Sequence, residues 1–137
     1  MKIYFKEITI ETNQRRELIN ITEKVEEVVK ESNIKNGVVL IFVPHATAAL
    51  ITNEDEPNIK KDYLNLFEKL VPENGNYYHN LIDNNADAHL LSVLLKPFLI
   101  FPIKDNRVVR GTWQEIFLVE LDGPRIRRII IEVLGQG

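Results

Sequence analysis

The sequence predicts an α+β fold, in which a layered, mostly antiparallel β-sheet packs with three helices in a single domain. The first observation is the order of the predicted elements, because a strand, a helix, a strand, two helices and a run of short-linked strands favour this class over a doubly wound sheet. The second is the length of 137 residues, which suits one domain with its own core. We therefore assign residues 1–137 to one domain.

The first part of the chain contains two predicted strands, a helix and a buried strand. Residues 2–12 alternate with period two and predict a half-exposed strand, which a turn joins to a short returning strand at 17–20. Residues 21–32 carry an apolar stripe and early acidic residues, which predicts a helix capped by Thr22. The apolar run 38–43, ended by Pro44, predicts a buried strand that leads into a polar loop.

The second part contains two predicted helices followed by strands. Apolar residues recur at helical spacing over 57–70, and Pro57 suits the first position of that helix. Residues 76–85 look irregular, and 86–95 predict a short helix. Strands are predicted at 97–103, 108–110, 114–121 and 126–134, and we expect them to form a β meander. The only tryptophan, Trp113, is expected to pack in the core.

Composition argues against several functional classes. The chain has no cysteine, so disulfides, thiolate metal sites and cysteine nucleophiles are excluded. The net charge of −3 lacks the basic surplus of a nucleic-acid-binding protein. No apolar run reaches the roughly 18 residues of a membrane span, and no signal-like segment follows Met1. We therefore expect a cytoplasmic protein without nucleic-acid or membrane partners.

The three histidines fall within polar segments that are separated along the chain. His45 follows the buried strand, and His79 and His89 flank an asparagine-rich segment. Three imidazole ligands and an open fourth position are typical of a catalytic zinc site. The three histidines of this chain, however, are not spaced as in a local zinc-binding motif. The alternative is that at least one histidine only forms a hydrogen bond. If they converge, nearby carboxylates would orient the rings, whereas magnesium would bind carboxylates directly; the candidates are Glu54, Asp83 and Asp87.

Other residues are suited to binding an anion. A helix that starts beside Asn85 would present free backbone N–H groups to a phosphate. Gly111 allows the backbone to approach a ligand closely, and Arg125 offers a planar guanidinium, although 122–125 is most simply a turn. The sequence has no glycine-rich phosphate loop, nucleophile elbow or dinucleotide fingerprint, which disfavours nucleotide-dependent and serine-hydrolase chemistry.

Seven motifs, in this order and over nearly the whole chain, resemble the YjbQ or UPF0047 family, also called secondary thiamine-phosphate synthase. They are Pro44-His45-Ala-Thr47-Ala-Ala, Asn53-Glu54-Asp55-Glu56, Leu70-Val-Pro72-Glu73, His79-Asn80, Asn85-Ala-Asp87-Ala-His89, Gly111-Thr-Trp-Gln114 and Asp122-Gly-Pro-Arg125. Departures are small: Ala46 replaces a threonine of many relatives, Asn106 a glycine, and Leu81-Ile82 a more polar linker.

The resemblance implies a homotrimer with a site near the subunit boundaries that contains the three histidines and often a metal or an anion. It also implies a weak activity that joins hydroxymethylpyrimidine pyrophosphate to a thiazole phosphate. Zn²⁺, with Mg²⁺ as the alternative, would be held by His45, His79 and His89. Glu54 or Asp87 would orient ligands or move a proton. The candidates for binding the phosphate-bearing substrate are Thr47, Asn53, Asn85, Thr112, Gln114 and Arg125.

Two other functions remain open at this point. Departure of pyrophosphate usually recruits magnesium, whereas three imidazoles prefer zinc, and this mismatch favours a zinc-dependent hydrolase of a small phosphorylated substrate. The other alternative is a trimeric metal- or anion-binding protein without turnover. An open metal position beside an acid would support an enzyme, and a closed site or an anion without metal would support the binder.

Overall fold

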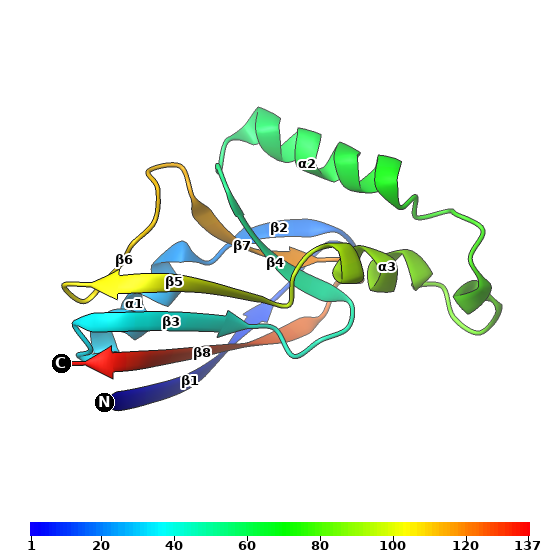
Figure 1. Ribbon diagram of the computed structural model, residues 1–137. Helices are drawn as coiled ribbons and strands as arrows, with labels where there is room; N and C mark the ends of the chain where they lie inside the picture. The colour runs from blue at the N-terminus through cyan, green and yellow to red at the C-terminus, as the bar shows by residue number, and fades with distance from the viewer.

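The computed structural model describes residues 1–137 and contains two antiparallel sheets and three α-helices (Figure 1). The five-stranded sheet has the order β1 (Lys2–Glu11), β8 (Ile126–Gln136), β3 (Asn36–Phe42), β5 (Phe98–Lys104) and β6 (Arg107–Val108). The three-stranded sheet has the order β2 (Glu17–Asn20), β7 (Glu115–Glu120) and β4 (Ala48–Asn53). The helices are α1 (Thr22–Ser32), α2 (Pro57–Leu70) and α3 (Ala86–Leu94), with a 3₁₀ turn η1 at Tyr78–Leu81. The predicted α+β class is confirmed.

The C-terminal strands do not form the predicted meander. Only β5 and β6 pair as a hairpin, while β7 is the centre of the three-stranded sheet and β8 lies between β1 and β3. The physical reason is burial: residues 116–120 of β7 are all buried, so this strand needs neighbours at both edges. In β8, Ile129, Ile131 and Val133 alternate into the core from the middle of its sheet.

The sequence predicts a loop after His45, whereas the structure contains a further strand there, β4. It pairs with β7 over its whole length, from Ala48 opposite Glu120 to Asn53 opposite Glu115. Ala48 and Leu50 belong to the main core, whereas Ala49 packs on the other side of the sheet. Because both faces are buried, the strand has no clear polar alternation that sequence patterning could detect.

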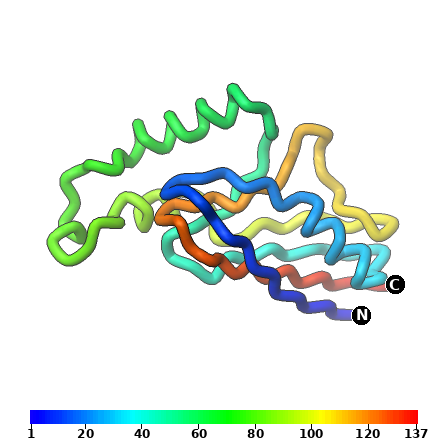
Figure 2. The backbone as a smooth tube through the Cα atoms, turned by 180° about the vertical axis from the view of Figure 1, so that it is seen from behind, coloured from blue at the N-terminus to red at the C-terminus, as the bar shows by residue number.

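Two hydrophobic cores lie on the two sides of the three-stranded sheet. The main core fills the space between the two sheets and receives the apolar side of α1. A smaller core joins the other face to α2 and α3 through Phe67, Leu91 and Val119. The backbone view from behind shows α1 over the sheets and the two termini side by side (Figure 2). No helix has the length and apolar character needed to cross a membrane.

The helix starts differ from one another. Glu56 caps α2 by accepting the N–H groups of Asn58 and Ile59, with Pro57 at the first position as predicted. The predicted cap of α1 by Thr22 is wrong. Its hydroxyl accepts the N–H of Ile116 at 2.8 Å and so connects the helix to β7.

Candidate functional site

The predicted site residues fall at the two ends of the β4–β7 pair. His45 and Thr47 precede β4 at the end where β7 finishes, close to the turn that carries Asp122. Glu54 follows β4 at the opposite end. Five residue steps at about 3.3 Å each separate the two ends by roughly 17 Å. Within one chain the structure therefore gathers some of the candidates and separates the others.

Two of the three histidines lie side by side. His79 comes from η1 and His89 from α3, and their ring centroids are 5.0 Å apart at an interplanar angle of 71°. His79 Nε2 is 3.0 Å from Asn85 Oδ1. An amide oxygen only accepts, so Nε2 carries the proton and Nδ1 is the free acceptor of the neutral ring. The amide nitrogen of Asn85 in turn donates to Asp122 at 2.9 Å, which orients the side chain.

A cavity of about 550 Å³ opens beside this pair. Its lining residues come from the loop before α3 and from the first turns of that helix: Asn76, Tyr77, Tyr78, His79, Ala86, His89 and Leu90. The volume suits a small organic ligand. Aromatic rings and an apolar wall favour a planar group, and the two imidazoles and Asn76 are among the polar groups of the cavity.

Arg125 provides a cationic group linked to the same network. Its Nε donates to the carbonyl of Asp122 at 2.8 Å, and its terminal nitrogen donates to the Asp122 carboxylate at 3.0 Å. Half of its side chain remains exposed, at 51%. Asp122 thus connects Arg125 to Asn85, and Asn85 connects to His79, so these three predicted residues belong to one hydrogen-bonded unit.

His45 makes a different contact. Its Nε2 accepts the backbone N–H of Arg128 at 2.9 Å, so the neutral ring carries its proton on Nδ1. Burial, followed by repulsion from Arg127 and Arg128, lowers the pKa of His45 below its usual value. His45 does not line the cavity beside His79 and His89.

The residues of one chain do not complete the predicted three-histidine metal site. No group of three or more histidine or carboxylate side chains is placed to hold a metal ion. The neighbouring pair offers two imidazoles, whereas catalytic zinc typically has three protein ligands. Any such site therefore needs a ligand from outside the chain.

Asp87 is engaged in ion pairs. It is fully buried and accepts hydrogen bonds from both terminal nitrogens of Arg15 at 2.9 Å and from one terminal nitrogen of Arg16 at 3.0 Å. Burial alone would raise the pKa of Asp87, but the hydrogen bonds from Arg15 and Arg16 outweigh it and lower that pKa. Within a single chain this carboxylate holds α3 to the β1–β2 turn through its contacts with Arg15 and Arg16.

Thr47 belongs to a buried cluster that the sequence pattern does not predict. One terminal nitrogen of Arg127 donates hydrogen bonds to both the hydroxyl and the carbonyl oxygen of Thr47, each at 2.9 Å. Arg127 also forms an ion pair with the buried Glu120. Thr12 donates to the same carboxylate at 2.8 Å. The available signal is spacing, because Arg127 shares the period-two face of Ile129, Ile131 and Val133, the core residues of β8.

The remaining candidates lie at the opposite end. Thr112 and Gln114 are exposed, and the Gln114 side chain accepts the N–H of Gly111 at 2.6 Å. The backbone carbonyl of Glu54 accepts a hydrogen bond from the Tyr63 hydroxyl, and the preceding residue, Asn53, is the last of β4. The prediction that Trp113 packs in the core is wrong, since 69% of it is exposed on this loop.

Comparison with known proteins agrees with this architecture. A family model described as "UPF0047 protein YjbQ-like" matches residues 6–136. A UPF0047 protein of Methanothermobacter thermautotrophicus is 43% identical over 136 residues, covering 99% of this chain and 95% of that protein. A Sulfolobus solfataricus crystal structure, described as a YbjQ-like protein of unknown function, has a TM-score of 0.96 and 47% identity. It covers 98% of this chain and 99% of its own.

A second crystal structure, of a YjbQ/UPF0047 family protein from Clostridium acetobutylicum, has a TM-score of 0.90 and 32% identity, and covers 94% of this chain and 99% of its own. The family model and these similarities extend over the sheets, the helices and both groups of candidate residues. The chain belongs to the YjbQ-like UPF0047 family.

Proposed function

We propose that the protein is an enzyme for a small phosphate-bearing substrate, which binds in the cavity at the start of α3. The observation that carries the proposal is the His79–His89 pair beside this cavity, linked through Asn85 and Asp122 to Arg125. The activity that the family resemblance implies is thiamine-phosphate synthesis from a pyrimidine pyrophosphate and a thiazole phosphate.

The chain's own groups suit the charge changes of that reaction. The thiazole nitrogen would form a bond to the hydroxymethyl carbon while the carbon–oxygen bond to pyrophosphate breaks, so negative charge collects on the leaving group. Arg125 and the first turn of α3 would stabilise this charge. The tyrosines of the cavity would position the heterocycle. Without a metal, protonated His79 or His89 would donate to the departing phosphate oxygen, whereas with a metal bound the two rings would hold the ion instead.

A divalent metal and a homotrimer form the second part of the proposal. His79 and His89 offer two imidazoles. The remaining histidine of the sequence, His45, would have to come from a second copy and exchange its hydrogen bond with the Arg128 N–H for the metal, since a neutral ring has one free nitrogen. Such a site would favour zinc, whereas magnesium would bind through the oxygen atoms of the pyrophosphate group of the substrate. This arrangement agrees with a site near subunit boundaries.

The enzyme proposal is tested by assaying pyrophosphate release from the two synthase substrates. We expect turnover by the wild-type protein and roughly a 100-fold or greater loss in His79→Ala and in His89→Ala, the usual effect of removing a proton-transfer group. Lys61→Ala, an exposed change on α2, is the control. Full activity in both folded histidine variants would overturn the proposal.

The same experiment separates the alternative functions. Phosphate release from one substrate alone would identify the hydrolase. Pyrophosphate binding without turnover, lost in His89→Ala, would identify the binding protein and reject the enzyme.

The metal content of the purified protein tests the proposed metal site. Elemental analysis of the purified protein should give one zinc per chain, and either His79→Ala or His45→Ala should remove it. Protein that stays free of zinc after incubation with the ion would reject the histidine metal site, and magnesium dependence of the synthase assay would then support the oxygen-bound alternative.

A further inference from the structure

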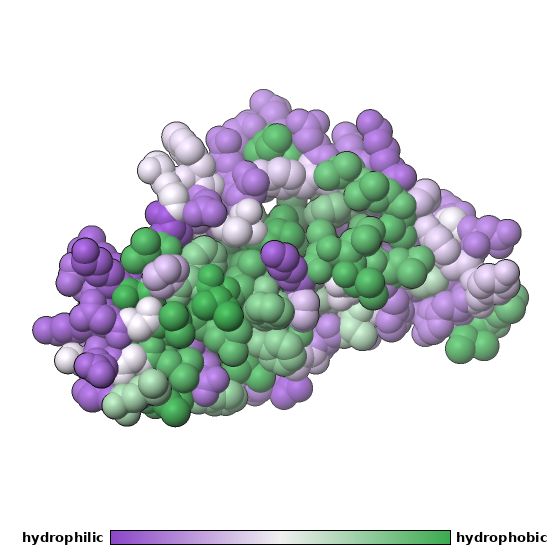
Figure 3. Space-filling view, viewed as in Figure 1, coloured by the Kyte–Doolittle hydropathy of each residue, from purple (hydrophilic) through white to green (hydrophobic).

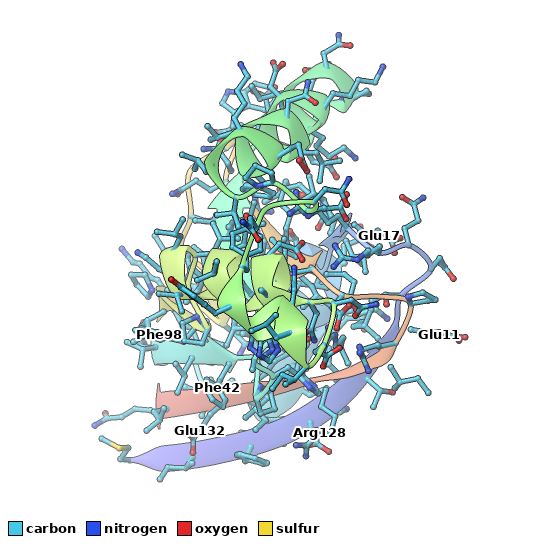
Figure 4. The ribbon with its side chains drawn as sticks, turned by 90° about the vertical axis from the view of Figure 1, so that its right-hand side faces the viewer. Glu11, Glu17, Phe42, Phe98, Arg128 and Glu132 are labelled. Carbon is cyan, nitrogen blue, oxygen red and sulfur yellow. The ribbon has the colours of Figure 1, made fainter.

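The β1–β2 turn, residues 12–16, contacts two parts of the candidate site at once. On one side it lies against residues 122–125, which we call the Arg125 turn, and the Gly123 N–H donates to the carbonyl of Arg15 at 3.0 Å. On the other side the guanidinium of Arg15 donates to Asp87 of α3 at 2.9 Å. Figure 4 labels the strand residues that flank the β1–β2 turn, Glu11 and Glu17. One short segment therefore fixes the Arg125 turn relative to the start of α3.

The contact with Asp87 is important for α3 because the outer side of this helix is uncovered. Figure 3 shows hydrophobic residues at the surface over α3, and Val93 and Leu94 are 80% and 62% exposed. On its inner side the helix packs Leu91 into the smaller core, and the fully buried Asp87 binds the arginines of the β1–β2 turn. The first turn of α3, which lines the cavity, is thus attached to the β1–β2 turn.

Thr12 is the residue of the β1–β2 turn that holds the backbone of Arg125. Its N–H donates to the Arg125 carbonyl at 2.8 Å, and its hydroxyl oxygen accepts the Arg125 N–H, also at 2.8 Å. The single hydroxyl proton goes to the Glu120 carboxylate at 2.8 Å, because this charged acceptor is stronger and closer than the Arg125 carbonyl at 3.0 Å. Both polar backbone groups of Arg125 are therefore fixed through Thr12, which also contacts the buried Glu120–Arg127 pair.

The guanidinium of Arg125 keeps one terminal nitrogen without a partner. Nε and one terminal nitrogen donate to Asp122, while the other, Nη1, forms no hydrogen bond or ion pair within the chain. A planar guanidinium with free N–H groups suits a phosphate oxygen. The side chain is half exposed, so the fixed backbone and Asp122 are what confine it. Such preorganisation lowers the cost of ordering the side chain when an anion binds.

We propose that Thr12 is a positioning residue of the candidate site, which holds Arg125 in place for the pyrophosphate group of the substrate. Thr12 does not line the cavity, so its influence on the anion passes through the Arg125 turn. The inference rests on the proposed function in one respect, namely that Arg125 binds the anion. It adds the requirement that the β1–β2 turn keeps its contact with the Arg125 turn.

Calorimetric titration with inorganic pyrophosphate tests the positioning role without turnover. Thr12→Val keeps the size of the side chain and removes the hydroxyl, and we expect the dissociation constant to rise about tenfold as the backbone of Arg125 is released. Thr12→Ser keeps the hydroxyl and should bind within about twofold of the wild type. Thr9→Val, an exposed change on β1, is the matched control and should have no effect.

A double-mutant cycle with Arg125→Gln separates positioning from a general loss of stability. Arg125→Gln should weaken pyrophosphate binding by about tenfold or more, and Thr12→Val should add no further loss in that background. An equal loss from Thr12→Val in both backgrounds, or wild-type binding by Thr12→Val, would overturn the positioning role alone. Wild-type binding by Arg125→Gln would instead reject the anion-binding role of Arg125 in the proposed function, and the positioning role with it.

Gly123→Ala provides a second variant in case Thr12→Val does not fold. A Cβ at this position would overlap the carbonyl oxygen of Gln14 and stand 2.9 Å from Thr12 Oγ1. The Arg125 turn must therefore move away from the β1–β2 turn, although the hydroxyl of Thr12 is retained. We expect weaker pyrophosphate binding, with no further loss when Gly123→Ala is combined with Arg125→Gln. Folded Gly123→Ala protein that binds pyrophosphate as tightly as the wild type would contradict the proposal.

Discussion

At the scale of single residues, the cluster behind His45 shows how this fold accommodates charge. Glu120 is fully buried and accepts from Arg127, Thr12 and two backbone N–H groups, those of Leu121 and Asp122. Burial would raise the pKa of Glu120, but the hydrogen bond from Arg127 and the others outweigh it and lower that pKa. The pair therefore stays ionised and fixes the start of β8 against the loop before β4.

Arg127→Met should destabilise the protein strongly, because it leaves Glu120 buried without its cation. The expected loss in the free energy of unfolding is about 3–5 kcal/mol. Arg128→Met, which removes an exposed pair with Glu7, is the control and should cost roughly 0–1 kcal/mol. Urea unfolding at pH 7 measures both, and equal losses would contradict the difference in burial.

His45 should titrate below the usual histidine range. Its lowered pKa means that the unfolded chain binds the proton more readily than the folded one. The stabilisation is therefore fully present above about pH 6.5, the unfolded value, and decreases as the pH falls toward the folded pKa. NMR titration of the ring gives the pKa, and unfolding at pH 7.5 and 5.5 should show a smaller pH effect in His45→Asn than in the wild type. The same pH effect in both would exclude His45 as its source.

At the scale of elements, Asp87 attaches α3 to segments that are distant in sequence. It binds Arg15 and Arg16 of the β1–β2 turn, and Arg16 also donates to the carbonyl of Val71 just after α2. Arg15 further pairs with Glu73. These contacts hold the helix that carries His89, so Asp87 serves the candidate site by positioning.

Acid should weaken this attachment. The pKa of Asp87 is lowered in the fold, so its contribution to stability is present above the unfolded value of about 4 and is lost as the pH falls through the lower folded value. Asp87→Asn should cost about 3–5 kcal/mol at pH 7, and the difference from wild type should shrink below pH 4. Urea unfolding between pH 7 and pH 3 measures this. Asp62→Asn on the exposed side of α2 is the control, and a constant difference across that range would contradict the prediction.

At the scale of the whole molecule, the outer face of the five-stranded sheet exposes Ile3, Phe5 and Ile100 around Glu132, and its covering by other copies would couple assembly to stability. If copies cover this face, folding and association are coupled by mass action. The melting temperature should then rise with protein concentration over the micromolar range, and the rise should be smaller in Glu132→Lys. Calorimetry at several concentrations checks this, and a melting temperature independent of concentration would argue for a stable monomer.

Local patterns in the sequence predict the class of fold and most of its elements. Strand 2–12, helix 57–70, the helix after Asn85 and the strand that ends at Pro44 agree with the structure within a few residues. These elements carry clear local signals: alternation, helical spacing and capping residues. The motifs also placed His79, Asn85, His89 and Arg125 among the candidates, and these lie in or beside one hydrogen-bonded network.

The order of the strands in the sheets, and which candidate residues meet, depend on contacts between distant parts of the chain. Strand β4 is buried on both faces, so alternation could not reveal it, and its length places Glu54 and Thr47 at opposite ends of the sheet. The partners of Asp87 and the Thr47 partner of Arg127 are more than 70 residues away, which no local pattern encodes. Sequence spacing reports one strand or helix at a time, whereas a site, a buried ion pair and an uncovered face depend on how strands distant in the chain pair with one another.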